Sequence, residues 1–163
     1  MKNNFFKRCF FSILTIIAAS LLLTACNKND YNGNNNNNDK MYTVSGNASG
    51  AQETPAVTTT ATGTLTGTYN AGTNTLNYNI NWTGLTGVAS AVHFHGPADA
   101  GVKADVLVPI TITTNGVSGN ATGSVVVVDS VENALLAGKV YYNVHTATNI
   151  DGEIRGQVTT TAN

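Results

Sequence analysis

Three histidines are the residues of this chain whose types and spacing point most directly to chemistry. His93 and His95 lie two residues apart in Ala-Val-His-Phe-His-Gly-Pro, and His145 lies in Asn-Val-His-Thr. Residues two apart in a β-strand point to the same side, so the first two imidazoles can bind one metal ion. A third imidazole can join them if the strand of His145 lies next to theirs. His93, His95 and His145 are therefore a candidate zinc or copper site, although the first expectation for the domain is that it needs no cofactor.

The remainder of that site is open at this point. A carboxylate can complete a set of four ligands, and the candidates are Glu53, Asp99, Asp151 and Glu153. In the alternative interpretation the histidines are structural. They then pack against loops and hydrogen-bond the backbones of Gly96, Pro97 and Thr146, which fixes the ends of their strands.

Arg155 and Glu53 form a second candidate interaction. Arg155 lies in Gly-Glu-Ile-Arg-Gly, where small neighbours leave room for a flat guanidinium. Glu53, in Ala-Gln-Glu-Thr-Pro, is its best partner for a bidentate ion pair that joins the N-terminal segment to the last strand. The alternative roles for Glu53 are metal ligand and acid catalyst, and Glu153 can join either network.

Strands must position these residues. From Met41 onward the chain is rich in Thr, Gly and Val, a composition that favours strands and turns. Apolar and polar residues alternate in runs such as 76–82 and 140–144, and turn signals such as Asn115-Gly116 separate the runs. The sequence predicts an all-β fold, an antiparallel Greek-key-like β-sandwich of about eight strands. One short helix interrupts it, because Asp129 and Glu132 predict a capping box and Gly138 ends the helical pattern.

The same alternation assigns a face to each side chain. If Val92 and Phe94 belong to the core, His93 and His95 point outward. On the last two strands the residues predicted to face outward are Tyr141, Asn143, His145, Glu153, Arg155 and Gln157. Trp82 continues an apolar face, and we expect it in the core rather than on a sugar-binding surface.

The first 25 residues have the pattern of a lipoprotein signal peptide. A basic start precedes an apolar stretch, and small residues precede Cys26. Leu23-Thr24-Ala25-Cys26 resembles the lipobox of bacterial lipoproteins, which implies cleavage before Cys26 and acylation of its sulfur. An ordinary signal peptide followed by a chance cysteine is the alternative.

Residues 26–40 consist of the lipidated cysteine and an asparagine-rich segment with almost nothing that can pack, so we expect a flexible tether. The domain proper then covers residues 41–163. Its partner at one end is the membrane, through the lipid anchor. These features place the protein in the cell envelope, attached to a bacterial membrane and facing the periplasm or the cell exterior.

Charge and cysteine content exclude several classes of protein. Residues 41–163 carry three Lys or Arg against seven Asp or Glu, so they offer no basic surface for nucleic acid. Cys9 and Cys26 both precede that segment, which therefore has no thiol for a disulfide, a nucleophile or a metal. The sequence contains no nucleophile elbow and no phosphate-binding glycine loop, and we expect no enzymatic activity.

Three segments resemble the CHRD domain, a module named after chordin. They are SGNASGAQETPAV (45–57), AVHFHGPADAGVKADVLVPI (91–110) and LLAGKVYYNVHTATNIDGEIRGQV (135–158). In chordin such domains belong to an extracellular antagonist of a growth factor, so the resemblance implies a binding module but names no ligand. The strand with His-x-His is also faintly similar to copper/zinc superoxide dismutase, although three histidines are too few for a two-metal centre.

Two hypotheses for function follow. The first is a membrane-anchored extracytoplasmic lipoprotein whose CHRD-type domain binds an unknown protein or extracellular ligand without catalysis. The alternative is a copper- or zinc-binding β-sandwich that uses His93, His95 and His145.

Overall fold

Alternating apolar and polar residues form nine β-strands in the computed structural model, which describes residues 40–163. The strands are β1 (Met41–Ser49), β2 (Thr62–Asn70), β3 (Thr75–Thr83), β4 (Ala89–His95), β5 (Val106–Ile110), β6 (Gly119–Val126), β7 (Tyr141–Thr146), β8 (Ile154–Gln157) and β9 (Thr159–Ala162). A 3-10 helix, η2 (Gly50–Gln52), follows β1, and α1 (Asp129–Leu136) lies between β6 and β7. The predicted signal peptide, Cys26 and all of the predicted tether except its last residue lie outside the described residues.

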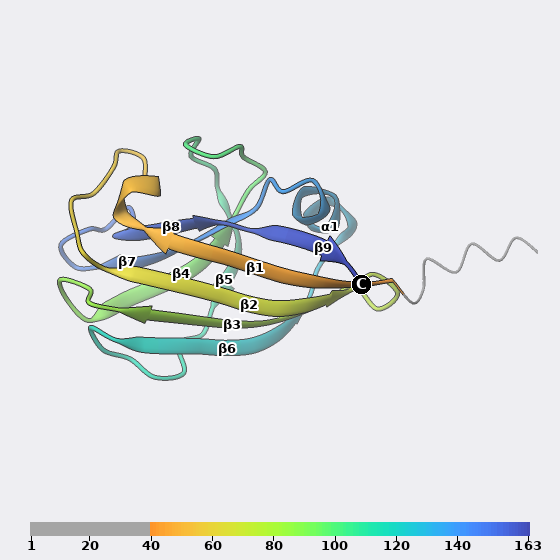
Figure 1. Ribbon diagram of the computed structural model, residues 1–163, viewed down its shortest axis with the longest axis horizontal. Coiled ribbons are helices and arrows are strands. Elements are labelled where there is room, and N and C mark those ends of the chain that lie inside the picture. The colour runs from red at the N-terminus through yellow and green to blue at the C-terminus, as the bar shows by residue number, and fades with distance from the viewer. Residues whose placement is uncertain (1–39) are drawn as a thin grey trace, which may run out of the picture. The chain divides into compact units, whose positions relative to one another are not determined.

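The strands form two layers that are hydrogen-bonded into one nearly closed sheet. Its order is β5-β4-β7-β8-β1-β2-β3-β6, with β9 paired to β1, and every strand pair is antiparallel. In Figure 1 the strands β1, β2, β3 and β6 form the front layer, and β4, β5 and β7 lie behind them. The connections from β3 to β4, from β5 to β6 and from β6 to β7 cross between the layers. The predicted all-β, sandwich-like fold with one short α-helix is confirmed.

The two layers meet where β8 approaches β1. One residue pair, Ser49 with Arg155, joins these strands, and the chain then continues as β9 along β1. A glycine makes this approach possible, because a Cβ on Gly156 would lie 2.7 Å from the backbone oxygen of Asn47. The last part of the chain can therefore pair with β7 in one layer and with β1 in the other.

The core fills the space between the layers and is built from one side of each long strand. Fully buried residues of this core include Val44, Leu65, Ile80, Val92 and Tyr142. Trp82 is 3% exposed, which confirms its predicted place in the core. Its indole nitrogen donates a hydrogen bond to the carbonyl of Gly116 at 3.1 Å, so the one polar atom of the ring is satisfied.

The outward faces of the two layers differ in exposure. On β1, β2, β3 and β6 they carry Thr, Ser and Asn side chains, most of them exposed. On β7 every residue is buried, as are Ile154, Arg155 and Gly156 of β8. Polar segments cover this second face: Arg155 donates to the carbonyl of Asp99 and Gln157 to that of Ala98. Alternation therefore predicted the direction of these side chains correctly, but loops rather than solvent lie over them.

The helix is where it was predicted, but its start differs. Asp129 is the first residue of α1, and the N-cap position belongs to Val128, which has no side chain that can accept a hydrogen bond. The predicted capping box is therefore wrong, and Asp129 instead lies in the first turn, where its charge favours the helix dipole. Gly138 has a φ of +69°, which suits its predicted role just past the helix. Within residues 40–163 no helix is long and apolar enough to span a membrane.

The junction of the two layers gives a first prediction. A Gly156→Ala substitution puts a methyl group against the backbone of β1, and we expect it to lower the free energy of unfolding by about 1 to 3 kcal/mol. Gly87→Ala is the control, because its Cβ would have no neighbour closer than 3.9 Å. Urea unfolding checks this, and equal midpoints for the two variants would contradict the close approach.

Candidate metal centre and adjoining cavity

Strands β4 and β7 bring the three histidines together. In their antiparallel register His93 lies opposite Asn143, and His95 lies opposite Tyr141. His145 follows Asn143 by two residues, so it points to the same side of the sheet as His93 and His95. The structure thus places the three predicted ligands in one cluster on the covered face.

The ring nitrogens of this cluster converge. His93 Nδ1 lies 3.0 Å from His145 Nε2, and one ligand atom from each histidine lies within 4.8 Å of the others. Two nitrogens bound tetrahedrally to one zinc ion are roughly 3.4 Å apart, given Zn–N distances of about 2.0 to 2.1 Å. The rings must therefore approach one another by about 1.4 Å at most to hold an ion, and rotation of the imidazoles can supply such a movement.

Backbone carbonyls orient two of the imidazoles. His95 Nδ1 lies 3.0 Å from the carbonyl oxygen of Ala104, and His145 Nδ1 lies 2.9 Å from that of Ile150. A carbonyl oxygen can only accept, so each Nδ1 carries the proton and each Nε2 is an acceptor. The Nε2 of His145 accepts a hydrogen bond from His93 Nδ1, and a bound metal ion would replace that proton. His95 Nε2 is buried and has no hydrogen-bond partner among the described residues. Metal-binding histidines ordinarily have this arrangement, in which the second nitrogen donates to a carbonyl.

The cluster also favours neutral imidazoles. Burial lowers the pKa of His93, and the neighbouring His145 and His95 lower it further. Burial is likewise the largest effect on the pKa values of His95 and His145, which are lowered although hydrogen bonds to Ala104 and Ile150 oppose the shift. A neutral imidazole is the form that binds a metal ion, so protons compete little at neutral pH.

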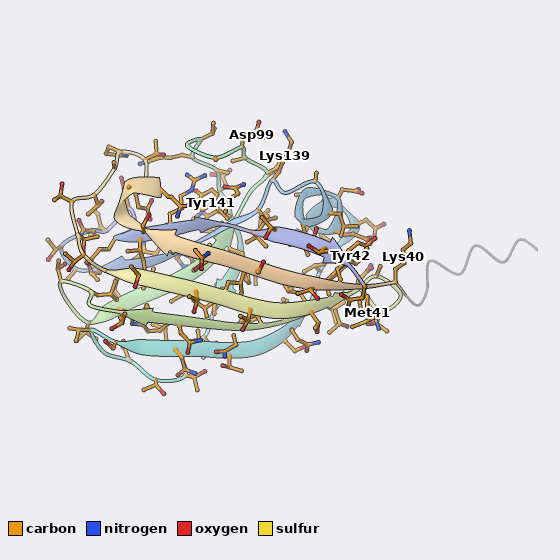
Figure 2. The ribbon with its side chains drawn as sticks, in the orientation of Figure 1. Lys40, Met41, Tyr42, Asp99, Lys139 and Tyr141 are labelled. Atoms are coloured by element: carbon orange, nitrogen blue, oxygen red, sulfur yellow. The ribbon has the colours of Figure 1, made fainter. Side chains whose placement is uncertain are left out.

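Among residues 40–163, no carboxylate joins the histidines in this cluster. Asp99 Oδ1 lies 3.2 Å from Lys139 Nζ, and Asp151 Oδ2 lies 2.9 Å from Lys103 Nζ. Both ion pairs are exposed. Figure 2 shows Asp99 and Lys139 beside each other on the outside of the fold. The structure therefore does not place a fourth ligand at either of these two candidates.

Glu153, the third candidate, is fully buried and occupied by other partners. Its carboxylate accepts hydrogen bonds from the backbone and hydroxyl of Thr86, the hydroxyls of Thr59 and Thr146, and the amide of Asn149, at 2.7 to 3.2 Å. Burial acts to raise the pKa of Glu153, but these hydrogen bonds outweigh it and lower the pKa. Glu153 is therefore a structural carboxylate.

The predicted ion pair between Glu53 and Arg155 is not among the ion pairs of the described residues. The guanidinium carbon of Arg155 lies 3.5 Å from the centroid of the Tyr141 ring, and Nη2 donates to the carbonyl of Asp99 at 3.3 Å. Stacking on the aromatic face therefore takes the place of a carboxylate partner. Glu53 is 8% exposed, and burial raises its pKa to about 7 although Arg155 acts to lower it.

A cavity of about 190 Å³ adjoins the histidine cluster. Its lining includes Glu53, His95, Tyr141, Asn143, His145 and Arg155. Within the described residues, three buried polar atoms of this lining lack a hydrogen-bond partner: Glu53 Oε1, Asn143 Oδ1 and His95 Nε2. The Tyr141 ring stacks on His95, with a centroid distance of 4.9 Å and an interplanar angle of 2°. The cavity is thus bordered by metal-ligating, cationic and carboxylate groups.

The sequence reasoning missed Tyr141 and Asn143 as site residues. The alternation predicts that both face outward, but Tyr141 is only 3% exposed and Asn143 only 2%. The signal that could have found them is their spacing, because Tyr141, Asn143 and His145 alternate along one face of β7.

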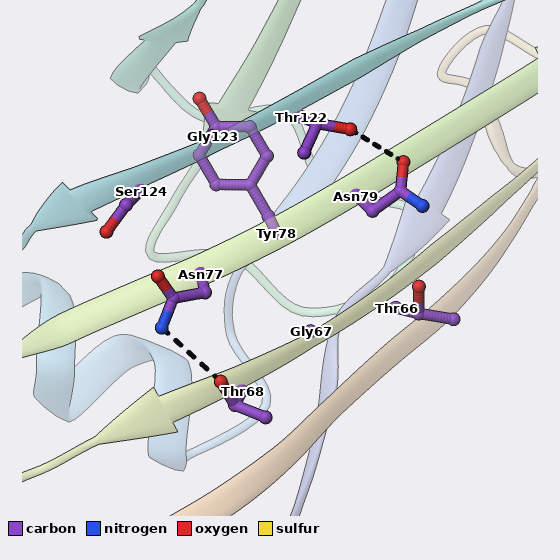
Figure 3. Close-up of a pocket in the computed structure, with 9 residues that line it drawn as sticks. All are labelled: Thr66, Gly67, Thr68, Asn77, Tyr78, Asn79, Thr122, Gly123 and Ser124. Atoms are coloured by element: carbon purple, nitrogen blue, oxygen red, sulfur yellow. Dashed lines mark hydrogen bonds between the residues drawn. The ribbon is translucent and has the colours of Figure 1, made fainter.

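A larger hollow of about 660 Å³ lies elsewhere, over β2, β3 and β6. Figure 3 shows that its lining is made of hydroxyl and amide side chains around Tyr78, with hydrogen bonds from Thr122 to Asn79 and from Asn77 to Thr68. Four of these side chains pair with one another, and none of the lining side chains carries a charge. The histidine cavity is therefore the better candidate for a functional site.

A family model supports the assignment made from the quoted segments. The CHRD domain model matches residues 44–158, which include most of β1, all of β2 to β8, the histidine cluster and the cavity. This chain belongs to the CHRD domain family. Comparison with curated proteins and with solved structures gave no match. The CHRD domain of this chain is accordingly an interaction-type domain with a polar cavity on the covered face of its β4–β7–β8 layer.

The environment of Glu53 gives a pH prediction. The folded-state pKa of about 7 exceeds the ordinary value of 4.5, so the folded protein holds a proton that the unfolded chain releases. The contribution of Glu53 to stability should therefore fall as the pH rises from 5 to 8, by up to about 3 kcal/mol. The three histidines contribute in the opposite direction, because their lowered pKa values make stability rise with pH up to about the ordinary value of 6.5. Glu53→Gln should remove this decline in urea unfolding, whereas Asp105→Asn, at an exposed carboxylate, should retain it. An ion pair with Arg155 would instead depress the pKa of Glu53 and abolish the decline in the unmodified protein.

Proposed function

We propose that this protein is a membrane-anchored, extracytoplasmic CHRD domain that binds zinc or copper through His93, His95 and His145. The observation that supports the metal site is the convergence of three imidazoles with ligand atoms within 4.8 Å of one another. Two of them have their other nitrogen held by a backbone carbonyl. This arrangement fits three-histidine metal binding better than the structural alternative, because purely structural histidines have no need of an unpartnered, buried Nε2.

Zinc and copper are the metals that suit this donor set. Neutral imidazoles bind both ions, whereas calcium and magnesium prefer oxygen ligands. Three histidines leave one coordination position for water or for a ligand that enters from the cavity. The proposed role is binding rather than catalysis, in keeping with the interaction-type domain and with the absence of catalytic motifs from the sequence.

The anchoring part of the proposal rests on the N-terminal sequence. Leu23-Thr24-Ala25-Cys26 ends an apolar stretch with a basic start, the pattern of a signal peptide that is cleaved before an acylated cysteine. Two or more acyl chains give stable membrane attachment, whereas one does not. The domain is then held at a bacterial membrane, on the periplasmic or outer side.

Metal binding is tested by thermal or urea unfolding of the purified protein. Zinc or copper at about one hundred times the dissociation constant should raise the free energy of unfolding by about 2.7 kcal/mol. The double variant His93→Ala, His95→Ala should lose this gain, and its unfolding without metal shows whether it still folds. Glu53→Gln is the matched control, since it removes a cavity carboxylate but no imidazole. A shift that persists in the folded double variant would contradict the site.

Anchoring is tested at the two cysteines of the sequence. In a bacterial host that processes lipoproteins, Cys26→Ser should abolish both acylation and cleavage before residue 26, because no sulfur remains to be acylated, so a longer, unacylated precursor should accumulate. Cys9→Ser should leave the mature protein in the membrane fraction, since Cys9 lies within the proposed signal peptide. Mass spectrometry of the mature N-terminus checks the acyl chains, and an unacylated N-terminus in the unmodified protein would refute the anchor.

A further inference from the structure

The cavity beside the histidines is lined by one cationic and one acidic buried side chain that do not pair with each other. Arg155 and Glu53 both line it, yet no ion pair joins them among the described residues. Both side chains are buried, with 1% and 8% exposure. Tyr141 and the carbonyl of Asp99 stabilise Arg155 without a carboxylate, and burial raises the pKa of Glu53 to about 7, so neither side chain has a partner of opposite charge in the described part of the fold. A ligand with an anionic and a cationic end would supply a partner to each.

The unpartnered acceptors of the cavity are also gathered in one place. Glu53 Oε1, Asn143 Oδ1 and His95 Nε2 are buried acceptors without hydrogen-bond partners among residues 40–163. The Asn143 side chain lowers the pKa of Glu53 and raises that of His95, so it lies close to both. A Cβ added to Gly152 would meet both Glu53 Oε1 and the Asn143 amide nitrogen, so these two side chains converge over Gly152. An ammonium group has three N–H donors, which is the number of acceptors here.

We propose that this cavity binds a small α-amino acid. Its carboxylate would lie at the guanidinium of Arg155, and its ammonium group at Glu53, Asn143 and His95. The volume of about 190 Å³ suits a ligand of this size. A second hollow of about 340 Å³ shares Glu53 and Arg155 in its lining and gives room for a side chain.

Simpler ligands match the cavity less well. A carboxylate without an amine leaves three buried acceptors unpartnered, and an amine without a carboxylate leaves Arg155 without an anion. Lys103 also lines the cavity, but it is exposed and paired with Asp151. It should therefore contribute less than Arg155 to the binding of a carboxylate.

This inference goes beyond the metal site and does not depend on it. The two sites share one ligand atom, His95 Nε2, so a bound metal ion removes one acceptor from the amino acid. His93, by contrast, belongs to the metal cluster and not to the lining of the cavity. Substitution of His93 therefore separates the two kinds of binding.

The test is isothermal titration of the purified protein after removal of metal on a chelating resin. The probes are glycine and L-alanine, with acetate and methylamine as ligands that each lack one end. Glycine or alanine should bind at least about tenfold more tightly than either half-ligand. Equal binding of acetate, methylamine and glycine, or binding of none, would overturn the proposal.

Three variants then assign the contacts. Glu53→Gln should weaken glycine binding by about tenfold or more, because it removes the anionic partner of the ammonium group. Lys103→Ala, the matched control on the same lining, should change it less than about threefold. His93→Ala should abolish zinc binding and preserve glycine binding. Unchanged glycine binding in Glu53→Gln would overturn the site.

The two proposals fail separately. If zinc stabilises the protein and glycine does not bind, the amino-acid site is wrong and the metal site stands. If glycine binds with the predicted dependence on Glu53 and zinc has no effect, the metal site is wrong and the amino-acid site stands.

Discussion

One buried carboxylate, Glu153, holds the end of the sandwich on which the candidate site depends. It has no exposed surface, and burying an unpaired charge of this kind is costly unless hydrogen bonds compensate it. Here Thr59, Thr86 and Thr146 supply hydroxyl donors from three separate segments, and the backbone of Thr86 adds another. The charge therefore ties the segment after η2 and the β3–β4 connection to the end of β7. His145 immediately precedes Thr146, so this network also fixes the strand that carries the third imidazole.

Strand alternation predicted the histidine cluster but not its surroundings. The two-residue spacing of His93 and His95 fixes their common direction, and His145 joins them because β7 pairs with β4. Alternation also predicted which side chains of β7 and β8 point away from the core. Whether such a face meets solvent depends on the path of segments 50–57 and 96–105, and local sequence patterns do not encode that path. Tyr141, Asn143 and Arg155 are buried for this reason.

The predicted ion pair between Glu53 and Arg155 is a second case in which a tertiary contact, not the local sequence, decides the outcome. Scarcity of charge makes the two residues natural partners in the sequence, and the fold does bring them to one cavity. Tyr141, however, offers a flat face at 3.5 Å from the guanidinium carbon, and the carbonyl of Asp99 accepts one of its protons. Arg155 is thereby stabilised without a carboxylate, and desolvation then dominates the pKa of Glu53. A tertiary contact thus decides the charge state of a residue that the sequence alone assigns to a salt bridge.

The position of the site along β1 connects the binding and anchoring proposals. Strand β1 begins at Met41, next to the segment proposed as tether, and ends at Ser49, which pairs with Arg155 beside the cavity. The eight residue-to-residue steps from Met41 to Ser49, at about 3.4 Å each, separate these points by about 27 Å. In Figure 2, Lys40 and Tyr141 accordingly lie toward different ends of the fold. A domain tethered at residue 40 therefore presents its cavity away from the point of attachment, where a ligand can reach it from solution.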